Sequence, residues 1–199
     1  MDHTMNSAQQ EIVSFRFHAR GGQGAKTAAQ IFAEVALCCD YYVQAFPDYG
    51  PERRGAPIRT YVRVSNEEVL LHCAVESPDF VVVLDKTLAC DQSVASGMSF
   101  NSKIIVNTDK NPEEIRNSLC LTKNVSLTTL DASGIAEHFI GKNIPNIVML
   151  GALIKLSDFG TLENLKKVLE KGYSNHWGKE ITEKNYLSAR QGFEEVNKI

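Results

Sequence analysis

A strand, a glycine-rich turn and a helix follow one another within residues 15–37, and this run constrains the fold more than any other feature. Phe15–His18 is β-prone, Arg20–Gly24 reads Arg-Gly-Gly-Gln-Gly, and Ala25–Leu37 has the alanine, isoleucine and leucine content of a helix. Glycine lets the backbone approach a bound group closely, and a helix N-terminus offers unpaired N–H groups with a partial positive charge. The run therefore predicts an α/β fold whose turn contacts a phosphate or a pyrophosphate.

Two familiar glycine motifs do not fit this turn. The dinucleotide motif requires a first glycine where this chain has Ala19, and the nucleotide-binding P-loop requires a longer spacing before its lysine than Gly21 to Lys26 provides. A P-loop ATPase is therefore rejected. A structural alternative stays open, in which the glycines only allow the strand to fold tightly onto the helix.

The next segments predict further strands around an unusual loop. Tyr41–Phe46 is a second strand candidate, and the loop that follows it is rich in proline, glycine and charge. Side chains of two kinds alternate across Ile58–Val64, which predicts a strand with one buried face. One side carries Ile58, Thr60, Val62 and Val64, and the other carries Arg59, Tyr61 and Arg63. A turn at 65–68 leading into Val69–Leu71 predicts an antiparallel hairpin.

The rest of the chain alternates apolar runs with helical segments. Phe80–Leu84, Lys103–Val106 and Val125–Leu130 are apolar on both faces and are predicted to be central strands. Crossover helices are expected at 87–96 and 112–119, and further helices at 133–139, 146–156, 162–172 and 182–196. The predicted fold class is α/β, a three-layer α/β/α sandwich with a mostly parallel sheet, an antiparallel hairpin and a helical C-terminal third. We expect one domain over residues 1–199, with residues 1–10 as a flexible N-terminus.

Composition and charge exclude several classes of partner. The formal net charge of -3 gives no basic field to attract nucleic acid or an anionic membrane. The sequence contains no secretory signal and no run of about 18 apolar residues, so a cytoplasmic location without membrane contact is expected. The five cysteines lack C-x-x-C spacing and the five histidines are dispersed, so we expect neither an iron–sulfur cluster nor a metal site, and reduced, mostly buried thiols.

Two adjacent arginines stand in the loop after the second strand. If the two strands are parallel, Arg53 and Arg54 lie at the carboxyl ends of the strands, at the same edge of the sheet as the glycine turn. A guanidinium group suits phosphate because its planar fork donates paired hydrogen bonds. The alternative for this pair is a solvated loop or a salt bridge to a neighbouring subunit.

Several strings together carry a resemblance to a known family. They are Arg20–Gly24, Phe46–Pro57 (Phe-Pro-Asp-Tyr-Gly-Pro-Glu-Arg-Arg-Gly-Ala-Pro), Ser77-Pro78-Asp79, Asn146-x-Val148-x-x-Gly151-Ala152 and Glu183-Lys184-Asn185. The chain resembles the gamma subunits of pyruvate/2-oxoacid:ferredoxin oxidoreductases over most of its length, from Phe15 to Phe193. The string Glu-Arg-Arg-Gly-Ala-Pro is most similar to gamma subunits of the pyruvate type.

The resemblance implies an assembly that oxidatively decarboxylates a 2-oxoacid to acyl-coenzyme A and CO2 and reduces ferredoxin. In that family, alpha and beta subunits hold thiamine diphosphate and an iron–sulfur cluster, and a ferredoxin-like delta subunit or a fused equivalent carries electrons outward. The gamma subunit supplies packing and coenzyme A contacts. This chain is then part of an enzyme without being catalytic alone, because no residue in it is an obvious nucleophile or general base.

The resemblance also assigns site residues by position. The glycine turn, comprising Ala19, Arg20, Gly21, Gly22, Gln23 and Gly24, is similar to the family's coenzyme A loop, and Arg53 or Arg54 to its cationic phosphate contact. Asn146 and Asn185 are further candidates for coenzyme A contact, although an asparagine at a helix N-terminus is often a cap. The chain departs from the family at Ala19, where glycine is common, and at Asp48, where serine is common.

Two other functions remain open at this stage. A stand-alone Rossmann-like oxidoreductase could bind NAD with Asp48 accepting a hydrogen bond from the ribose, but the missing first glycine opposes it. A purely structural gamma subunit could use Arg53 and Arg54 to bind a neighbouring chain, with coenzyme A held elsewhere in the assembly.

Overall fold

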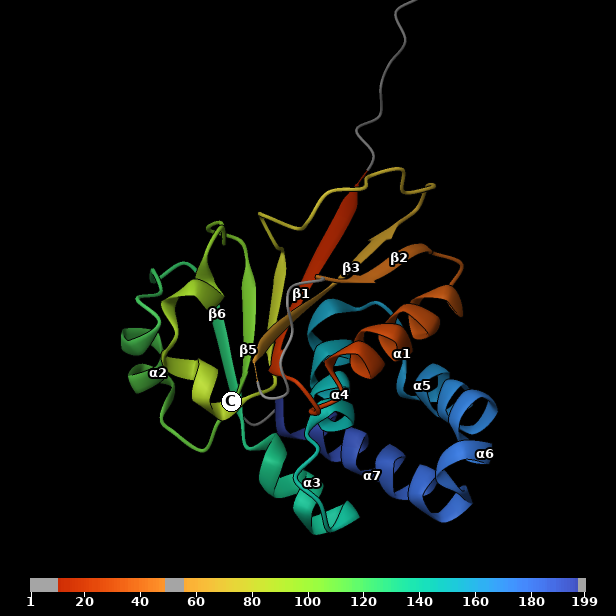
Figure 1. Cartoon of the computed structure of the whole chain (residues 1–199). Helices are drawn as coiled ribbons and strands as arrows, with labels where there is room; N and C mark the ends of the chain where they lie inside the picture. Colours follow the sequence, from red (N-terminus) through yellow and green to blue (C-terminus); the bar gives the residue numbers. More distant parts are fainter. Residues whose placement is uncertain (1–10, 49–55, 197–199) are drawn as a thin grey trace, which may run out of the picture.

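A computed structural model describes residues 11–48 and 56–196, and its framework is a six-stranded sheet. The strands lie in the order β2-β3-β1-β4-β5-β6, as Figure 1 shows. Their bounds are β1 Ile12–Arg20, β2 Tyr42–Pro47, β3 Pro57–Ser65, β4 Phe80–Val83, β5 Lys103–Asn107 and β6 Ser126–Leu130. Because β3 pairs antiparallel with both β1 and β2 while β1, β4, β5 and β6 pair in parallel, β3 alone among these strands runs in the opposite direction.

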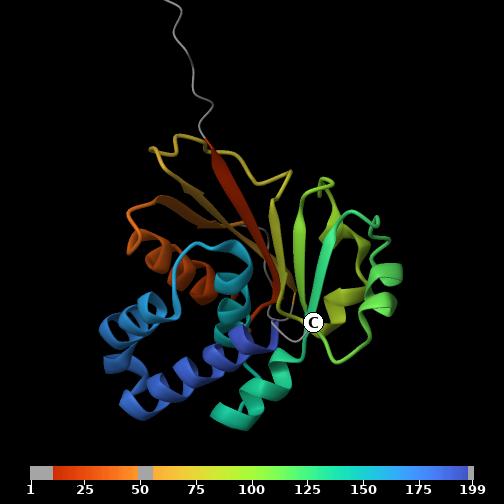
Figure 2. The ribbon, with the colours of Figure 1, turned by 180° about the vertical axis from the view of Figure 1, so that it is seen from behind.

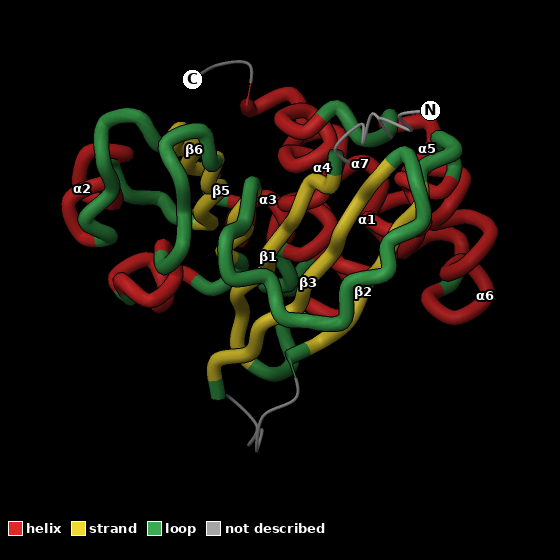
Figure 3. Tube along the Cα trace, turned by 90° about the horizontal axis from the view of Figure 1, so that it is seen from above, coloured by secondary structure: helices red, strands yellow, loops and turns green. Residues whose placement is uncertain are grey.

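Helices cover both faces of the sheet, so the predicted α/β architecture is confirmed. One face carries α2 (Pro112–Ser118) and the 3-10 turns η1 (Lys86–Cys90) and η2 (Gln92–Ala95) over β4 to β6. The other face carries the larger helical layer, visible in Figures 2 and 3. Its elements are α1 Ala25–Leu37, α3 Ala132–Ile140, α4 Asn146–Ser157, α5 Leu162–Val168, the π turn η3 Leu169–Tyr173, α6 Ser174–Trp177 and α7 Lys179–Glu195.

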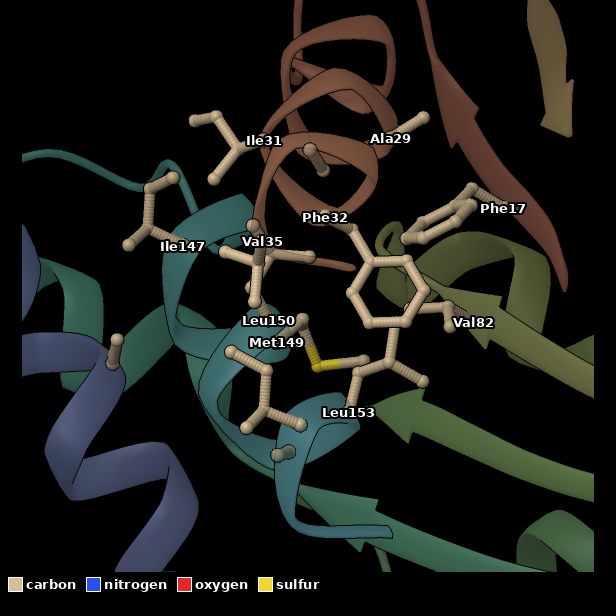
Figure 4. Close-up of a cluster of buried hydrophobic side chains, with 14 of the residues drawn as sticks. Phe17, Ala29, Ile31, Phe32, Val35, Val82, Ile147, Met149, Leu150 and Leu153 are labelled. Atoms are coloured by element: carbon tan, nitrogen blue, oxygen red, sulfur yellow. The ribbon is translucent and has the colours of Figure 1, made fainter. Parts of the chain in front are cut away.

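The main core lies between the sheet and two helices of the larger layer. Phe17 on β1 and Phe32 on α1 are fully buried, and Met149 and Leu153 of α4 pack in the same cluster (Figure 4). Nearly every residue of α4 is buried, as expected for a helix that is apolar on all sides and enclosed by other elements. The central position of α4 fixes where its first residue, Asn146, lies relative to the sheet.

Several predicted elements match the structure closely. The first helix begins at Ala25 and ends at Leu37, as expected from its composition. Helix α2 begins with Pro112, and the side chain of Asn111 caps it by accepting a hydrogen bond from the Glu113 amide. The antiparallel hairpin exists, but it joins β2 to β3, and Val69–Leu71 is not a strand, so the predicted pairing was wrong.

The prediction that only one face of β3 is buried was also wrong. Tyr61 and Arg63 are 2% and 3% exposed. Tyr61 packs against Phe46 of β2 with ring centroids 5.2 Å apart, and the segment after β3 contacts Arg63. The Arg63 guanidinium donates hydrogen bonds to the carbonyl oxygens of Cys73 at 2.6 Å and Ala74 at 3.3 Å. Backbone carbonyl oxygens thus take the place of water around the Arg63 guanidinium, although the alternating pattern of the strand predicted only one buried face.

Other differences concern the smaller helical layer and the cysteines. β6 is an edge strand and not a central one, because no strand pairs beyond it in the described sheet. The helix expected at 87–96 is two 3-10 turns, because Asp91 caps the second turn by accepting a hydrogen bond from the Ser93 amide. The thiols were expected to be mostly buried, but Cys38, Cys73, Cys90 and Cys120 are exposed, because they lie at helix ends or in loops. The short helix α6 was not predicted.

Candidate functional site

The glycine turn connects the carboxyl end of β1 to the N-terminus of α1. Gly22 and Gly24 have φ values of 101° and 76°, in the left-handed region that favours glycine. Gly24 is the N-cap of α1, no side chain caps this helix, and its first turn carries no acidic residue. The turn therefore presents backbone N–H groups and the positive end of a helix dipole without a competing carboxylate.

One side of this turn forms the wall of a cavity of about 410 Å³. Figure 1 shows the chain between β1 and α1 approaching the region where α3, α4 and α7 meet. The lining comes from segments far apart in sequence, namely Gly22, Gly24, Thr27, Ile140, Lys142, Ile144, Asn146, Ile147, Trp177, Ile181 and Asn185. Four residues predicted for the site, Gly22, Gly24, Asn146 and Asn185, therefore line the same cavity.

Asn146 connects the cavity floor to the glycine turn. It is the first residue of α4 and is 5% exposed. Its Nδ2 donates a hydrogen bond of 3.4 Å to the Gly24 carbonyl oxygen, and its Oδ1 accepts one of 2.9 Å from the Ile147 amide. A Cβ atom at Gly24 would lie 2.4 Å from Asn146 Nδ2. A side chain at residue 24 would therefore force the Asn146 amide out of its present position.

Asn185 approaches the same cavity from α7. It is 7% exposed, and its Nδ2 donates a hydrogen bond of 2.8 Å to the Ile181 carbonyl oxygen one turn earlier. This bond fixes the orientation of the amide. The predicted cap role applies to neither asparagine, because Asn146 is inside the first turn of α4 and Asn185 lies within α7.

Arg20 and Gln23 do not line the cavity and instead contact residues that follow β4. The Arg20 amide donates to Gln23 Oε1 at 2.8 Å, and Gln23 Nε2 in turn donates to the buried carboxylate of Asp85. Arg20 Nε donates to Thr87 Oγ1 at 2.9 Å and lies 3.8 Å from Asp85 Oδ1. These contacts hold the shape of the turn through residues that are not part of the cavity lining.

Ala19 and Gly21 belong to the framework beneath the turn. Ala19 is fully buried and pairs with Ile58 across the β1–β3 ladder, so its side chain faces the core. The Gly21 amide donates a hydrogen bond of 3.2 Å to the Ala56 carbonyl oxygen. This bond joins the glycine turn to the residue just before β3, at the same edge of the sheet.

Arg53 and Arg54 lie outside the described residues, but both ends of their loop are placed. The loop leaves the sheet after Pro47 and returns at Ala56, next to the glycine turn. At the start of the loop, Asp48 accepts a hydrogen bond of 3.0 Å from the Tyr61 hydroxyl and lies 3.4 Å from Arg59 Nε. Burial, followed by the bond to Asp48, raises the pKa of Tyr61. The carboxylate proposed for a ribose contact is thus engaged within the chain.

Lys142 and Trp177 also line the cavity, although neither was predicted from the sequence. Lys142 is an exposed residue that follows the left-handed C-cap of α3, Gly141, and it places an ammonium group at the cavity mouth. Trp177 is the only tryptophan of the chain and packs against Tyr173 with ring centroids 4.8 Å apart. Its uniqueness is the one sequence signal that could have drawn attention to it.

The described ranges, 11–48 and 56–196, contain no group of three or more histidine, cysteine, aspartate or glutamate residues arranged to hold a metal ion. No helix in these ranges combines the length and the apolar character that a membrane crossing requires.

Comparison with known proteins adds a consistent set of similarities. The sequence model of the family described as pyruvate ferredoxin/flavodoxin oxidoreductase matches residues 14–195. The chain is 39% identical to the pyruvate/ketoisovalerate oxidoreductases common subunit gamma of Pyrococcus furiosus, covering 93% of this chain and 97% of that protein.

Solved structures give the same result. The crystal structure of pyruvate oxidoreductase subunit PORC from Thermotoga maritima matches with a TM-score of 0.82 and 39% identity, covering 92% of this chain and 96% of that one. A 2-oxoglutarate:ferredoxin oxidoreductase from Magnetococcus marinus, with 2-oxoglutarate, coenzyme A and succinyl-CoA bound, matches with a TM-score of 0.76. That match is 20% identical and covers 95% of this chain and 32% of that longer chain, so it concerns the fold alone.

Proposed function

The chain belongs to the pyruvate ferredoxin/flavodoxin oxidoreductase family as a gamma-type subunit, and from this premise we propose that its cavity seats coenzyme A for the assembled enzyme. One observation carries the proposal. Gly22, Gly24, Asn146 and Asn185, which come from three separate segments, line a single cavity of about 410 Å³. A volume in the hundreds of cubic ångströms is that of a small-molecule site.

The electrostatic character of the cavity suits a ligand with phosphate groups. The N-terminus of α1 carries a partial positive charge, and Lys142 adds a full positive charge at the mouth. None of the described residues that line the cavity is acidic. The pyrophosphate of coenzyme A would meet backbone N–H groups at Gly22 and Gly24, with the guanidinium of Arg53 or Arg54 as a further contact from the adjacent loop.

The role of the chain in the reaction is binding and orientation. The described lining contains no histidine, cysteine, aspartate or glutamate that could act as nucleophile or general base. We assign decarboxylation and electron transfer to partner subunits of alpha, beta and ferredoxin-like delta type or their fused equivalents, which would hold thiamine diphosphate and iron–sulfur clusters. Coenzyme A contributes the thiol that accepts the acyl group, and this chain holds the coenzyme.

Pyruvate is the 2-oxoacid that we propose for the complex. The string Glu52–Pro57 resembles pyruvate-type gamma subunits, and the Thermotoga maritima relative is a pyruvate oxidoreductase subunit. Assaying the native complex with pyruvate, 2-oxoglutarate and branched-chain 2-oxoacids tests this choice, and the highest kcat/KM is expected with pyruvate.

An NAD-binding function finds less support in the same geometry. Asp48 would have to accept a hydrogen bond from a ribose hydroxyl, but its carboxylate already contacts Tyr61 and Arg59. Ala19 pairs within the sheet where a dinucleotide site would place its first glycine.

Calorimetric titration of coenzyme A into the assembled complex tests the seating role. Arg53→Ala and Arg54→Ala are the informative variants, and loss of the productive arginine should cost about 1.5–3 kcal/mol of binding free energy, as for a hydrogen bond to a charged group. Lys142→Gln should also weaken binding, because it removes the cation at the mouth. Lys123→Gln, far along the chain on the connection between α2 and β6, serves as the matched control. Unchanged affinity in all the arginine and Lys142 variants would favour a purely structural gamma subunit.

A further inference from the structure

Strand β2 forms one edge of the sheet and carries no charged side chain. Its residues read Tyr-Val-Gln-Ala-Phe-Pro, and β3 is the only strand that pairs with it in the described part of the chain (Figure 3). Soluble proteins usually protect an exposed sheet edge with charged side chains, prolines, bulges or a covering segment. Pro47, at the last position of β2, is the one such residue in the strand. The edge is therefore suited to pairing with a further strand.

The backbone groups that point outward from β2 follow from its pairing with β3. The Asp48 amide donates a hydrogen bond of 2.9 Å to the Arg59 carbonyl oxygen, next to the last pair of the ladder. Bonded and non-bonded pairs alternate along an antiparallel ladder, so the even-numbered residues of β2 bond toward β3. Val43 and Ala45 consequently direct their N–H and C=O groups away from the sheet, and Ala45 is exposed.

Helix α1 lies beside this edge and has opposite charges toward its two ends. Lys26 and Gln30 are exposed and Glu34 is half-buried, and their four-residue spacing places them on one face of the helix. Because α1 connects the end of β1 to the start of β2, it runs against the direction of β2. Lys26 thus lies near the end of β2, and Glu34 lies toward its start.

A groove and an exposed leucine occupy opposite ends of the same surface. The groove has a volume of about 220 Å³, and its lining is largely apolar apart from two side chains of α1 and one threonine: Lys26, Ala29, Gln30, Ala45, Phe46, Pro47 and Thr60. Leu37, the last residue of α1, is 53% exposed, and Tyr42, the first residue of β2, is 52% exposed. Both belong to the connection between α1 and β2, away from the groove.

A two-fold axis beside β2 brings the complementary parts of this surface together. In a two-fold interface, every contact between two different residues occurs twice. With the axis at Gln44, Val43 of one copy stands opposite Ala45 of the other, and each such pair exchanges both of its N–H···O bonds. Tyr42 then stands opposite Phe46 of the other copy, and aromatic cross-strand pairs stabilise a sheet.

The same axis matches the charges and the apolar groups of α1. The two α1 helices run antiparallel, so Lys26 of one copy approaches Glu34 of the other. Leu37 of one copy reaches the groove beside Pro47 of the other. The chain thus carries both halves of each contact, and this self-complementarity favours a second copy over an unrelated partner.

We propose that two copies of this chain pair through β2, antiparallel about Gln44, so that one sheet continues across both copies. The α1 helices form the other half of the interface, with Leu37 of each copy in the groove of its partner. None of the interface residues lines the cavity beside the glycine turn, so the pairing is independent of coenzyme A binding.

Charge reversal on α1 tests the contact in the full-length chain. Lys26→Glu alone and Glu34→Lys alone each place like charges opposite one another, so each should weaken dimerisation about tenfold in sedimentation equilibrium. An equimolar mixture of the two variants should recover the association of the parent protein, because every α1 contact in the mixed pair joins opposite charges. Lys123→Glu makes the same charge change at an exposed residue between α2 and β6, and should leave dimerisation unchanged.

Gln44→Cys tests the register and identifies the neighbour at this edge. Residues opposite one another in a non-bonded antiparallel pair have Cα atoms about 4.5 Å apart, within the range of a disulfide. Under mild oxidation, Gln44→Cys should link two copies of the chain at this position, both in the full-length chain and in the assembled complex. Mass spectrometry locates the linked peptides. Tyr42→Cys is the control, because Tyr42 faces Phe46 and not itself, and it should give little cross-link.

Three results would overturn the proposal. The first is a full-length chain that stays monomeric at millimolar concentration. The second is a mixture of Lys26→Glu and Glu34→Lys that associates no better than either variant alone. The third is a cross-link from Gln44→Cys to a different subunit of the assembled complex, which would place another chain at this edge.

Discussion

Gly151 on α4 approaches Ala189 on α7 so closely that a Cβ atom on Gly151 would lie 1.8 Å from the Ala189 carbonyl oxygen. The contact is reciprocal, because a Cβ atom on Gly192 of α7 would lie 2.3 Å from the Val148 carbonyl oxygen of α4. The two helices therefore meet backbone to backbone. Since one helix carries Asn146 and the other carries Asn185, this contact sets the distance between the two amides of the cavity.

Gly151→Ala is expected to separate these helices. The added methyl group meets a backbone carbonyl, which cannot move aside as a flexible side chain can, so we expect a loss of about 3 kcal/mol in the free energy of unfolding. Coenzyme A affinity should fall together with stability, because Asn146 and Asn185 move apart. Urea denaturation and calorimetric titration measure the two effects.

Gly172→Ala provides the matched control for this substitution. Gly172 lies in the π turn η3, where an added Cβ atom would have Glu34 Oε2 as its nearest neighbour, at 3.7 Å. That distance is an ordinary contact, so the variant should stay within about 1 kcal/mol of the parent protein. Equal stability of the two alanine variants would contradict the backbone contact between α4 and α7.

Gly24→Ala should damage the glycine turn in two ways. The left-handed φ of 76° costs an alanine about 1 kcal/mol, and the new methyl group also collides with Asn146 Nδ2. Gly141→Ala has the same backbone cost, with φ of 73°, but no atom lies within 4 Å of its added Cβ atom. We therefore expect Gly24→Ala to be the less stable variant in thermal melts. Indistinguishable melting temperatures would show that the Asn146 contact is unimportant.

The sequence predicted those elements whose signals are local. The helix Ala25–Leu37 was placed correctly because a glycine turn precedes it and helix-forming residues fill it, and α2 because Pro112 and Asn111 mark its start. The position of the glycine turn at a strand end was likewise a local inference. Its contact with a ligand stays a prediction.

Features that depend on distant segments were not accessible from the sequence. Tyr61 and Arg63 alternate with apolar residues as on a half-exposed strand, but both are buried. Phe46 packs against Tyr61, and carbonyl oxygens of the chain after β3 accept hydrogen bonds from Arg63. Lys142 and Trp177 reach the cavity only because α3 and α7 pack against α4 and α6 packs against α7. No pattern within either segment predicts that meeting point.

Asp85→Asn should loosen the glycine turn without touching the cavity directly. The Asp85 carboxylate is buried, accepts a hydrogen bond of 2.8 Å from the Thr87 amide, and also accepts from Gln23 Nε2. An asparagine supplies one acceptor oxygen in place of two and removes the charge opposite Arg20. We expect a loss of about 2 kcal/mol in the free energy of unfolding, in the range for hydrogen bonds to a charged group.

Asp91→Asn is the control for this change. Asp91 caps η2 by accepting a hydrogen bond of 2.9 Å from the Ser93 amide, and asparagine is an equally good cap. Chemical denaturation should show little change for this variant. If Asp85→Asn is equally harmless, the contacts among Asp85, Gln23 and Thr87 do not support the turn.

A buried histidine on β1 predicts a pH dependence of stability. His18 is 5% exposed, and its Nε2 accepts a hydrogen bond of 3.0 Å from Arg16 Nε. Burial, reinforced by the positive charge of Arg16, lowers the pKa of His18 from 6.5 to about 3. The folded protein therefore keeps this imidazole neutral in a pH range where the unfolded chain protonates it.

His18→Gln should remove this pH dependence, because glutamine also offers an acceptor to Arg16 but does not titrate. As the pH falls below 6.5, the unfolded chain binds a proton at this imidazole that the folded protein does not bind. The parent protein therefore loses about 1.4 kcal/mol of stability per pH unit, until the pH reaches the folded pKa of about 3. The stability of the parent relative to His18→Gln should consequently fall between pH 6.5 and 4.5, as measured by urea denaturation at each pH. The exposed residue His176 gives the control His176→Gln, and identical pH profiles for the two variants would refute the assignment to the buried imidazole.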